Sequence, residues 1–154
     1  MDRVPLAIAS ASTADIPTLV DLMREFYAES HYPLDGEWAA SSFRRLLADP
    51  SRGGAWIARS AGEPAGHVVL ALRHSMEFGG LAGVIDDLFV RPAFRRQGVG
   101  AALVRAVFEA CQERQAAAIE VEVGTANVAA GRLYESFGLS PNDAGRRSLA
   151  IRLD

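Results

Sequence analysis

Residues 94–103 read FRRQGVGAAL, and they place two glycines where a helix must begin. Glycine is among the poorest helix formers, but it accepts a positive φ and lets another group approach the backbone closely. The first amides of a helix have no carbonyl partner inside that helix, and the helix dipole is positive at this end. A phosphate group suits such a position. The stretch therefore predicts a phosphate-binding turn between a strand and a helix.

The spacing within this turn separates it from two other phosphate-binding motifs. A P-loop requires a Gly-Lys pair, and the chain contains no lysine. A dinucleotide fingerprint requires a third glycine where Leu103 stands. What remains is R-x-x-G-x-G, from Arg95 to Gly100. Taken alone, this pattern fits an ordinary glycine-rich turn with surface arginines equally well.

The elements on either side of the turn alternate as in a mixed sheet. Period-2 and continuous apolar runs predict strands at 6–9, 55–58, 66–72, 82–90, 118–123 and 147–153, and apolar spacing of three and four predicts helices at 16–27, 38–47, 98–114 and 127–137. This order indicates the α/β class (α+β mixed), with a mostly antiparallel sheet and helices on both faces. Only the two strands that flank the helix after Gly98 need be parallel, because they form a βαβ unit.

Composition sets the broad class of the protein. A chain of 154 residues with 49% apolar and 23% charged residues is expected to form one domain, residues 1–154. A net charge of −3 without basic runs argues against nucleic acid as a partner. One cysteine permits no intrachain disulfide. No run approaches the ~18 apolar residues that a membrane span needs, and the first residues do not form a signal peptide, so we expect a cytoplasmic protein without a membrane partner.

A second motif identifies the turn. Residues 127–138 read NVAAGRLYESFG, which has the form N-x-x-A-x-x-L-Y-x-x-x-G and opens a helix one strand after the glycine turn. With the strand and turn at 85–100, this motif resembles the GNAT superfamily of acyl-CoA-dependent N-acyltransferases. The three motifs stand in the order of that family. The resemblance implies a GNAT-like central sheet that splays around its one parallel pair, acetyl-CoA as acyl donor, and a homodimer.

The resemblance also assigns roles to individual residues. The backbone of Leu88, Phe89 and Val90 would pair with the pantetheine arm of the cofactor. The pyrophosphate would be bound by the turn, which comprises Arg95, Arg96, Gln97, Gly98, Val99, Gly100 and Ala101. Asn127 would bind the cofactor from the start of the next helix. Tyr134 would lie beside the thioester sulfur. A tyrosine has a pKa near ~10, so it is protonated at neutral pH and able to donate a proton to a departing thiolate.

The acceptor side is less sharply defined by the sequence. Asp86 aligns with an acidic position that some family members use as a base, directly or through water; it fits the binding of an ammonium group equally well. Because Asp86 and Asp87 are neighbours on a strand, they are expected to face opposite sides of the sheet. Tyr27, Glu29 and Tyr32 lie near the break between the first two helices, a region that often lines the acceptor pocket in this family. The histidines lack metal-ligand spacing, so no metal is expected.

The sequence therefore predicts an acetyl-CoA-dependent N-acetyltransferase whose acceptor is a primary amine of a small molecule. Direct attack in a ternary complex is expected, because Cys111 falls on the apolar stripe of its helix and leaves no nucleophile for an acyl-enzyme. One alternative is a protein N-terminal or lysine acetyltransferase. Another is a non-catalytic acyl-CoA-binding sensor, although the presence of Tyr134 argues against it.

Overall fold

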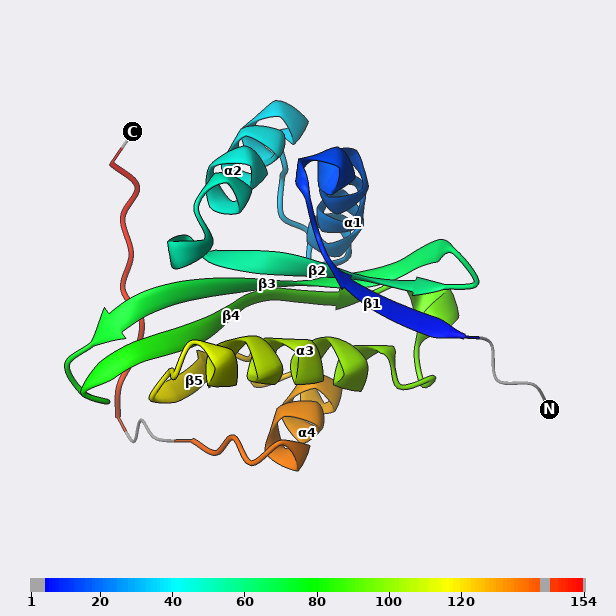
Figure 1. The fold of residues 1–154 in the computed structure, drawn as a ribbon. Helices are drawn as coiled ribbons and strands as arrows, with labels where there is room; N and C mark the ends of the chain where they lie inside the picture. The colour runs from blue at the N-terminus through cyan, green and yellow to red at the C-terminus, as the bar shows by residue number, and fades with distance from the viewer. Residues whose placement is uncertain (1–4, 142–144, 154) are drawn as a thin grey trace. The chain divides into compact units, whose positions relative to one another are not determined.

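The computed structural model describes residues 5–141 and 145–153, which belong to two compact units that divide after Glu122. The first unit contains a five-stranded sheet in the order β1-β2-β3-β4-β5 (Figure 1). The strands are β1 Leu6–Ser10, β2 Gly53–Ser60, β3 Glu63–Ser75, β4 Gly80–Val90 and β5 Ala118–Val121. Neighbours are antiparallel except β4 and β5, which are parallel. This confirms the predicted mixed sheet with a single parallel pair.

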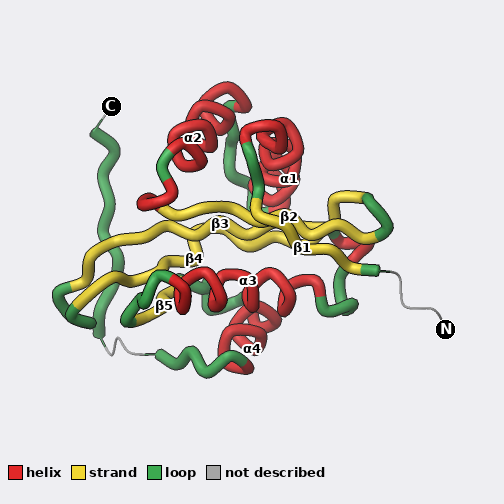
Figure 2. The backbone as a smooth tube through the Cα atoms, viewed as in Figure 1, coloured by secondary structure: helices red, strands yellow, loops and turns green. Residues whose placement is uncertain are grey.

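Helices cover both faces of this sheet. Helices α1 (Ile16–Glu29) and α2 (Gly36–Ala48) lie on one side, and α3 (Val99–Glu113) lies on the other (Figure 2). A capping box precedes α1, where Ser12 N donates to Asp15 Oδ2 at 2.9 Å. Helix α2 begins earlier than predicted because Asp35 caps it, accepting from Glu37 N and Trp38 N at 2.9 and 3.1 Å. Within the described ranges, no helix is both long and apolar enough to cross a bilayer.

Each face of the sheet buries its own set of apolar side chains. On the side of α1 and α2, the buried cluster comprises Ile16, Leu19, Val20, Leu22, Met23, Ala39, Phe43, Ala55, Ile57, Val69 and Phe89. On the other side, α3 buries its apolar stripe, which includes the predicted core residue Cys111. A Cβ built on Gly83 of β4 would lie 2.6 Å from Cys111 Sγ, so glycine is required where α3 approaches the strand.

Strand β4 changes faces at Asp86. Val69 of β3 pairs with Asp87, but the next residue of β3, Leu70, pairs with Ile85, so Asp86 has no partner in this ladder. This is a β-bulge, one extra residue that breaks the two-residue alternation of a strand. Ile85 therefore lies on the face of Leu70 and α3, whereas Asp87 lies on the face of Val69, toward α1 and α2. The bulge interrupts the regular alternation on which the expectation of opposite faces for Asp86 and Asp87 was based.

The second unit contains α4 (Val128–Ser136), whose two capping residues, Asn127 and Phe137, are the predicted ends of the helix. Asn127 caps it, its Oδ1 accepting from Ala130 N at 3.2 Å, and Gly138 follows its end with φ of 94°. The predicted strand at 147–153 is wrong: these residues form no ladder within the described chain, and Leu149, Ile151 and Leu153 are 81, 85 and 96% exposed. Alternation of polar and apolar residues is compatible with a β-strand, but a strand also requires a neighbouring strand that hydrogen-bonds to its backbone.

His67 of β3 is a polar side chain placed inside an apolar core. It is fully buried opposite Ile57 and Phe89, and neither ring nitrogen has a hydrogen-bond partner within the described residues. Burial alone lowers the pKa of this imidazole to about 4, because the charged form cannot be solvated there. His67 is therefore neutral in the folded protein at physiological pH.

We expect this histidine to make the fold sensitive to acid. The unfolded chain protonates His67 near its ordinary pKa of about 6.5, so stability is full above that pH and falls as the pH drops toward 4. Between pH 7 and pH 5 this group alone should cost about 2 kcal/mol of unfolding free energy. Urea unfolding of the wild type and of His67→Leu at both pH values tests this. Equal losses in the two proteins would contradict it, and we expect Leu to be tolerated at pH 7 because it leaves no unpaired buried polar atom.

Candidate active site

The glycine turn that follows β4 has the backbone of an anion cradle. A short 3-10 turn at Pro92–Phe94 follows the strand, and then Arg96 and Gly98 take left-handed conformations with φ of 64 and 82°. The first bond of α3 runs from Ala102 N to Gly98 O at 3.0 Å. The amides of Val99 to Ala101 precede that bond, so they have no carbonyl one turn earlier in the helix. A Cβ on Gly98 would meet no atom within 4 Å, which leaves the space above the turn open.

This turn has the backbone geometry of an anion-binding site. Left-handed residues alternating with ordinary ones collect successive N–H groups into a concave surface that binds anions. The helix dipole adds a partial positive charge at the same place. The residues nominated from the sequence at this turn, 95–101, thus lie at the start of α3, although their contact with a cofactor remains a prediction.

The pairing of β4 with β5 ends before the last residues of β4. Their parallel ladder runs from Ala82 and Ala118 to Ile85 and Val121, and there it ends. Residues 86–90 of β4 therefore continue past the last partner in β5, so this edge of the sheet is able to accept an extended ligand as an added strand. Leu88, Phe89 and Val90, which the sequence assigned to the pantetheine arm, belong to this segment. The carbonyl of Val90 already accepts a bond from Arg95 Nε at 2.9 Å.

The charges of two carboxylates at the bulge influence Tyr27. Burial raises the pKa of Asp87 to about 6, and the neighbouring charge of Asp86 adds to this effect. Burial also raises the pKa of Tyr27 on α1 to about 12, with smaller contributions from Asp87 and then Asp86. Asp86 itself is exposed, whereas Asp87 is half-buried. The structure thus places both carboxylates near α1, and Asp87 is the group that sequence reasoning missed.

Tyr27, Glu29 and Tyr32 do not form one group in this structure. The rings of Tyr27 and Tyr32 meet edge to face with centroids 6.3 Å apart. Glu29 instead binds Arg95, with its two carboxylate oxygens 2.8 and 2.7 Å from Arg95 Nη2. The sequence had assigned Glu29 to the acceptor and Arg95 to the cofactor. No signal in the sequence relates these two residues, which are 66 positions apart.

The second unit holds the other two nominated residues. Asn127 uses its side-chain oxygen to cap α4, which fixes its orientation at the helix start. Tyr134 is only 6% exposed, and its burial raises the pKa of the phenol to about 12. The Tyr134 hydroxyl is therefore protonated at neutral pH, as a proton donor must be.

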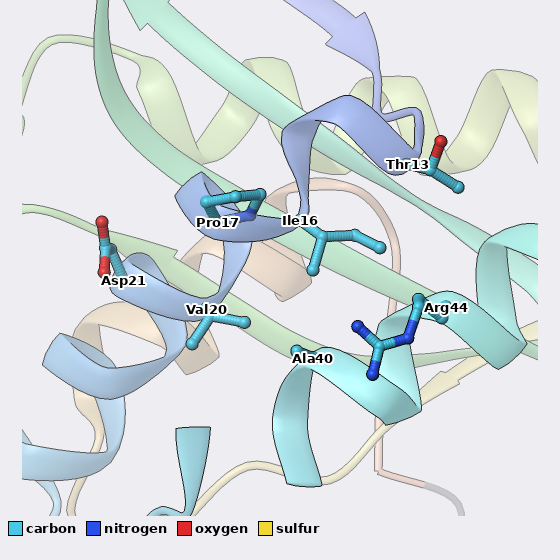
Figure 3. A pocket seen from close by; sticks show the side chains of 7 residues that line it. All are labelled: Thr13, Ile16, Pro17, Val20, Asp21, Ala40 and Arg44. Carbon is cyan, nitrogen blue, oxygen red and sulfur yellow. The ribbon is translucent and has the colours of Figure 1, made fainter. Parts of the chain in front are cut away.

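A separate groove lies between α1 and α2. It has a volume of about 480 Å³ and is lined by Thr13, Ile16, Pro17, Val20, Asp21, Ala40 and Arg44. Ile16 and Val20 face Ala40 and Arg44 across it (Figure 3). None of the residues nominated from the sequence lines this mainly apolar groove, so it is not the candidate site. No group of three or more His, Cys, Asp or Glu residues suited to a metal occurs in the part of the chain that the structure describes.

Comparisons with known proteins agree with this geometry. A sequence profile of the Acetyltransferase (GNAT) family matches residues 17–139. An uncharacterized N-acetyltransferase of Archaeoglobus fulgidus is 30% identical over an alignment of 138 residues that covers 86% of this chain and 93% of that protein. An integron cassette protein from the mobile metagenome of Cole Harbour Salt Marsh is 36% identical, with a TM-score of 0.83 over 96% of this chain and 90% of that chain.

More distant structures share only the fold with this chain. AAC(6')-Iy, solved in complex with the bisubstrate analog CoA-S-monomethyl-acetylneamine, is 16% identical and has a TM-score of 0.81 over 97% of this chain and 99% of that chain. The matched residues 17–139 include the strand with the bulge, the glycine turn and the helix of Tyr134.

Proposed function

Since the chain belongs to the acetyltransferase (GNAT) family, we propose that it acetylates a primary amine of a small molecule. Acetyl-CoA is the acyl donor, and it supplies the acetyl group as an activated thioester. The glycine turn at 95–101 would hold its pyrophosphate, and the edge of β4 at 88–90 would hold its pantetheine arm. Asn127 would bind it from the start of α4.

The observation that supports an amine acceptor is the carboxylate pair at the bulge in β4. An amine reaches the enzyme as an ammonium ion with a pKa near ~10, so it must be bound as a cation and then lose a proton. Asp86 and Asp87 supply negative charge beside the tyrosine ring of Tyr27, and both features attract a cation. The fold of AAC(6')-Iy, whose ligand joins coenzyme A to an amine compound, accommodates an acceptor of this kind.

The two carboxylates suit different parts of this task. Asp87 is partly buried and its pKa is raised to about 6, which places it closer to neutral pH, where a general base works best. Asp86 is exposed and able to meet the incoming ammonium first. We therefore assign proton acceptance to Asp87 and ammonium binding to Asp86. Tyr134 keeps a proton on Oη and is the assigned acid.

The pH dependence of the rate tests this division of roles. We expect kcat/KM to rise with pH through an apparent pKa near 6, and Asp87→Asn to remove that limb. Asp86→Asn should mainly raise the KM of the acceptor. Acceptors of graded pKa are the control, because a limb that follows the acceptor belongs to the substrate. A limb near pH 6 that persists in Asp87→Asn, or wild-type KM in Asp86→Asn, would contradict the assignment.

An acceptor screen with acetyl-CoA distinguishes the alternatives. Small amines, a peptide with a free N-terminus and a peptide with one lysine are compared by the release of free thiol. We expect turnover with small amines. If only a peptide is acetylated and no small amine is, the acceptor is a protein and not a small molecule. Binding of acetyl-CoA without turnover of any acceptor would favour a sensor.

A further inference from the structure

Two ion pairs join the end of α1 to the segment that leads into the glycine turn. Glu25 accepts from Arg91 Nε at 2.8 Å, and Glu29 accepts from Arg95 Nη2 at 2.8 and 2.7 Å. The acids are four residues apart on one helix, so they project from the same face. The arginines are also four residues apart and bracket the short turn Pro92–Phe94.

Each arginine also holds the backbone of the sheet. Arg91 Nη1 donates to Pro64 O at 2.9 Å, at the start of β3. Arg95 Nε donates to Val90 O at 2.9 Å, and its guanidinium lies 5.9 Å from the centre of the Phe89 ring. The planar guanidinium of arginine makes such contacts at several points at once, which lysine is unable to reproduce. Arg95 is thus fixed from three directions: by α1, by the end of β4 and by an aromatic ring.

These pairs contribute little to the stability of the fold. The side chains of Arg95 and Glu29 are 44 and 48% exposed, and ion pairs at such positions have small effects on unfolding. We therefore expect an effect of these ion pairs on the conformation of the segment that leads into the glycine turn. Arg95 precedes the left-handed residue Arg96 directly and lies three positions before Gly98. The contacts of Arg95 therefore act on the residue that leads into the left-handed positions of the turn.

We propose that Glu29 and Arg95 form a positioning pair, in which Glu29 holds the guanidinium of Arg95 so that the glycine turn presents its amides to acetyl-CoA. Neither side chain needs to touch the cofactor. The inference rests on the proposed function, because it requires that this turn binds acetyl-CoA. It changes the roles suggested by the sequence, which gave Arg95 to the cofactor and Glu29 to the acceptor.

Calorimetric titration of the full chain with acetyl-CoA tests the pair. Glu29→Gln keeps the size of the side chain but removes the charge that holds Arg95. We expect about tenfold weaker binding, because the amides of the turn are then no longer held in the geometry that the cofactor requires. Arg95→Lys keeps the positive charge but loses the planar fork, and we expect a similar loss. The double variant should be no weaker than either single variant, because both remove one interaction. The melting temperature without ligand should change little in all three.

Asp21→Asn is the matched control. Asp21 is an acid on the same helix, two turns before Glu29, and it lines the separate groove between α1 and α2. Asp21→Asn removes one negative charge from α1, as Glu29→Gln does, but it leaves the contacts of Arg95 intact. The affinity for acetyl-CoA should therefore equal that of the wild type.

The outcomes separate the positioning role from a direct one. If Arg95 contacts the pyrophosphate itself, Arg95→Lys retains most of the affinity and Glu29→Gln does not weaken it; either result overturns the pair. Wild-type affinity in every variant also overturns it and leaves the proposed function intact. If the wild-type protein does not bind acetyl-CoA, the proposed function fails and this inference fails with it.

Discussion

Replacing Tyr134 with phenylalanine is expected to lower kcat by roughly 10²- to 10⁴-fold, the range for loss of a general acid. The variant keeps the ring, and with it the packing of a side chain that is only 6% exposed. It removes the hydroxyl, whose pKa is raised to about 12 and which is therefore protonated through the neutral range. Steady-state rates at saturating acetyl-CoA and acceptor, measured under conditions where chemistry limits turnover, give the size of the loss.

Binding provides the control for this variant. Because phenylalanine preserves the apolar contacts, the melting temperature and the affinity for acetyl-CoA should match those of the wild type. An unchanged rate would make Tyr134 a packing residue and would leave the proton donor to be found elsewhere. A lowered rate with equally weakened cofactor binding would assign Tyr134 to the cofactor site and not to proton transfer.

Replacing Gly98 with glutamate is expected to abolish the thermal stabilisation that acetyl-CoA gives to the wild type. A ligand that binds only the folded state at about 100 times its Kd adds roughly 2.7 kcal/mol to the unfolding free energy. Glutamate adds bulk and negative charge to the open space above the turn, where the pyrophosphate is proposed to lie. Melting curves with and without acetyl-CoA measure the change.

Gly62→Glu is a close control for this experiment. Gly62 lies in the turn between β2 and β3, and its φ of 82° equals that of Gly98, again with no atom within 4 Å of a built Cβ. Both variants carry the same strain of a side chain in a left-handed conformation, about 1–2 kcal/mol. Only the variant at the glycine turn should lose the response to ligand. A normal response in folded Gly98→Glu would place the cofactor elsewhere.

The features that sequence reasoning predicted well are those encoded locally. The glycine turn and α3 follow from two glycines and an apolar stripe within a few residues, and α4 follows from a capping asparagine at one end and Gly138 at the other. The order of strands and helices then leaves only a mixed sheet with one parallel pair. The membership of the family is confirmed for the same reason, since its motifs are short and contiguous.

The features that escaped prediction depend on partners distant in sequence. The bulge at Asp86 exists only because β3 pairs out of step with β4, so the face of Asp87 was not readable from β4 alone. The Glu29–Arg95 pair joins a helix to a turn 66 residues away. The strand expected at 147–153 was predicted from alternation, which is a local pattern. A strand also needs a neighbouring strand to pair with, and the local pattern does not show whether one is present. That residues 1–154 act as one domain stays a prediction.

The extra residue in β4 also governs how this chain is to be aligned with its relatives. A relative whose strand has regular alternation requires a gap opposite Asp86. Without that gap, everything on one side of the bulge is shifted by one position, and an acid in the relative is matched to the wrong aspartate of the pair. The acid is matched to an aspartate in both cases, because residues 86 and 87 are both aspartate. The transfer of an acid from a relative to this chain is therefore safe only when the pairing with β3 has been compared first.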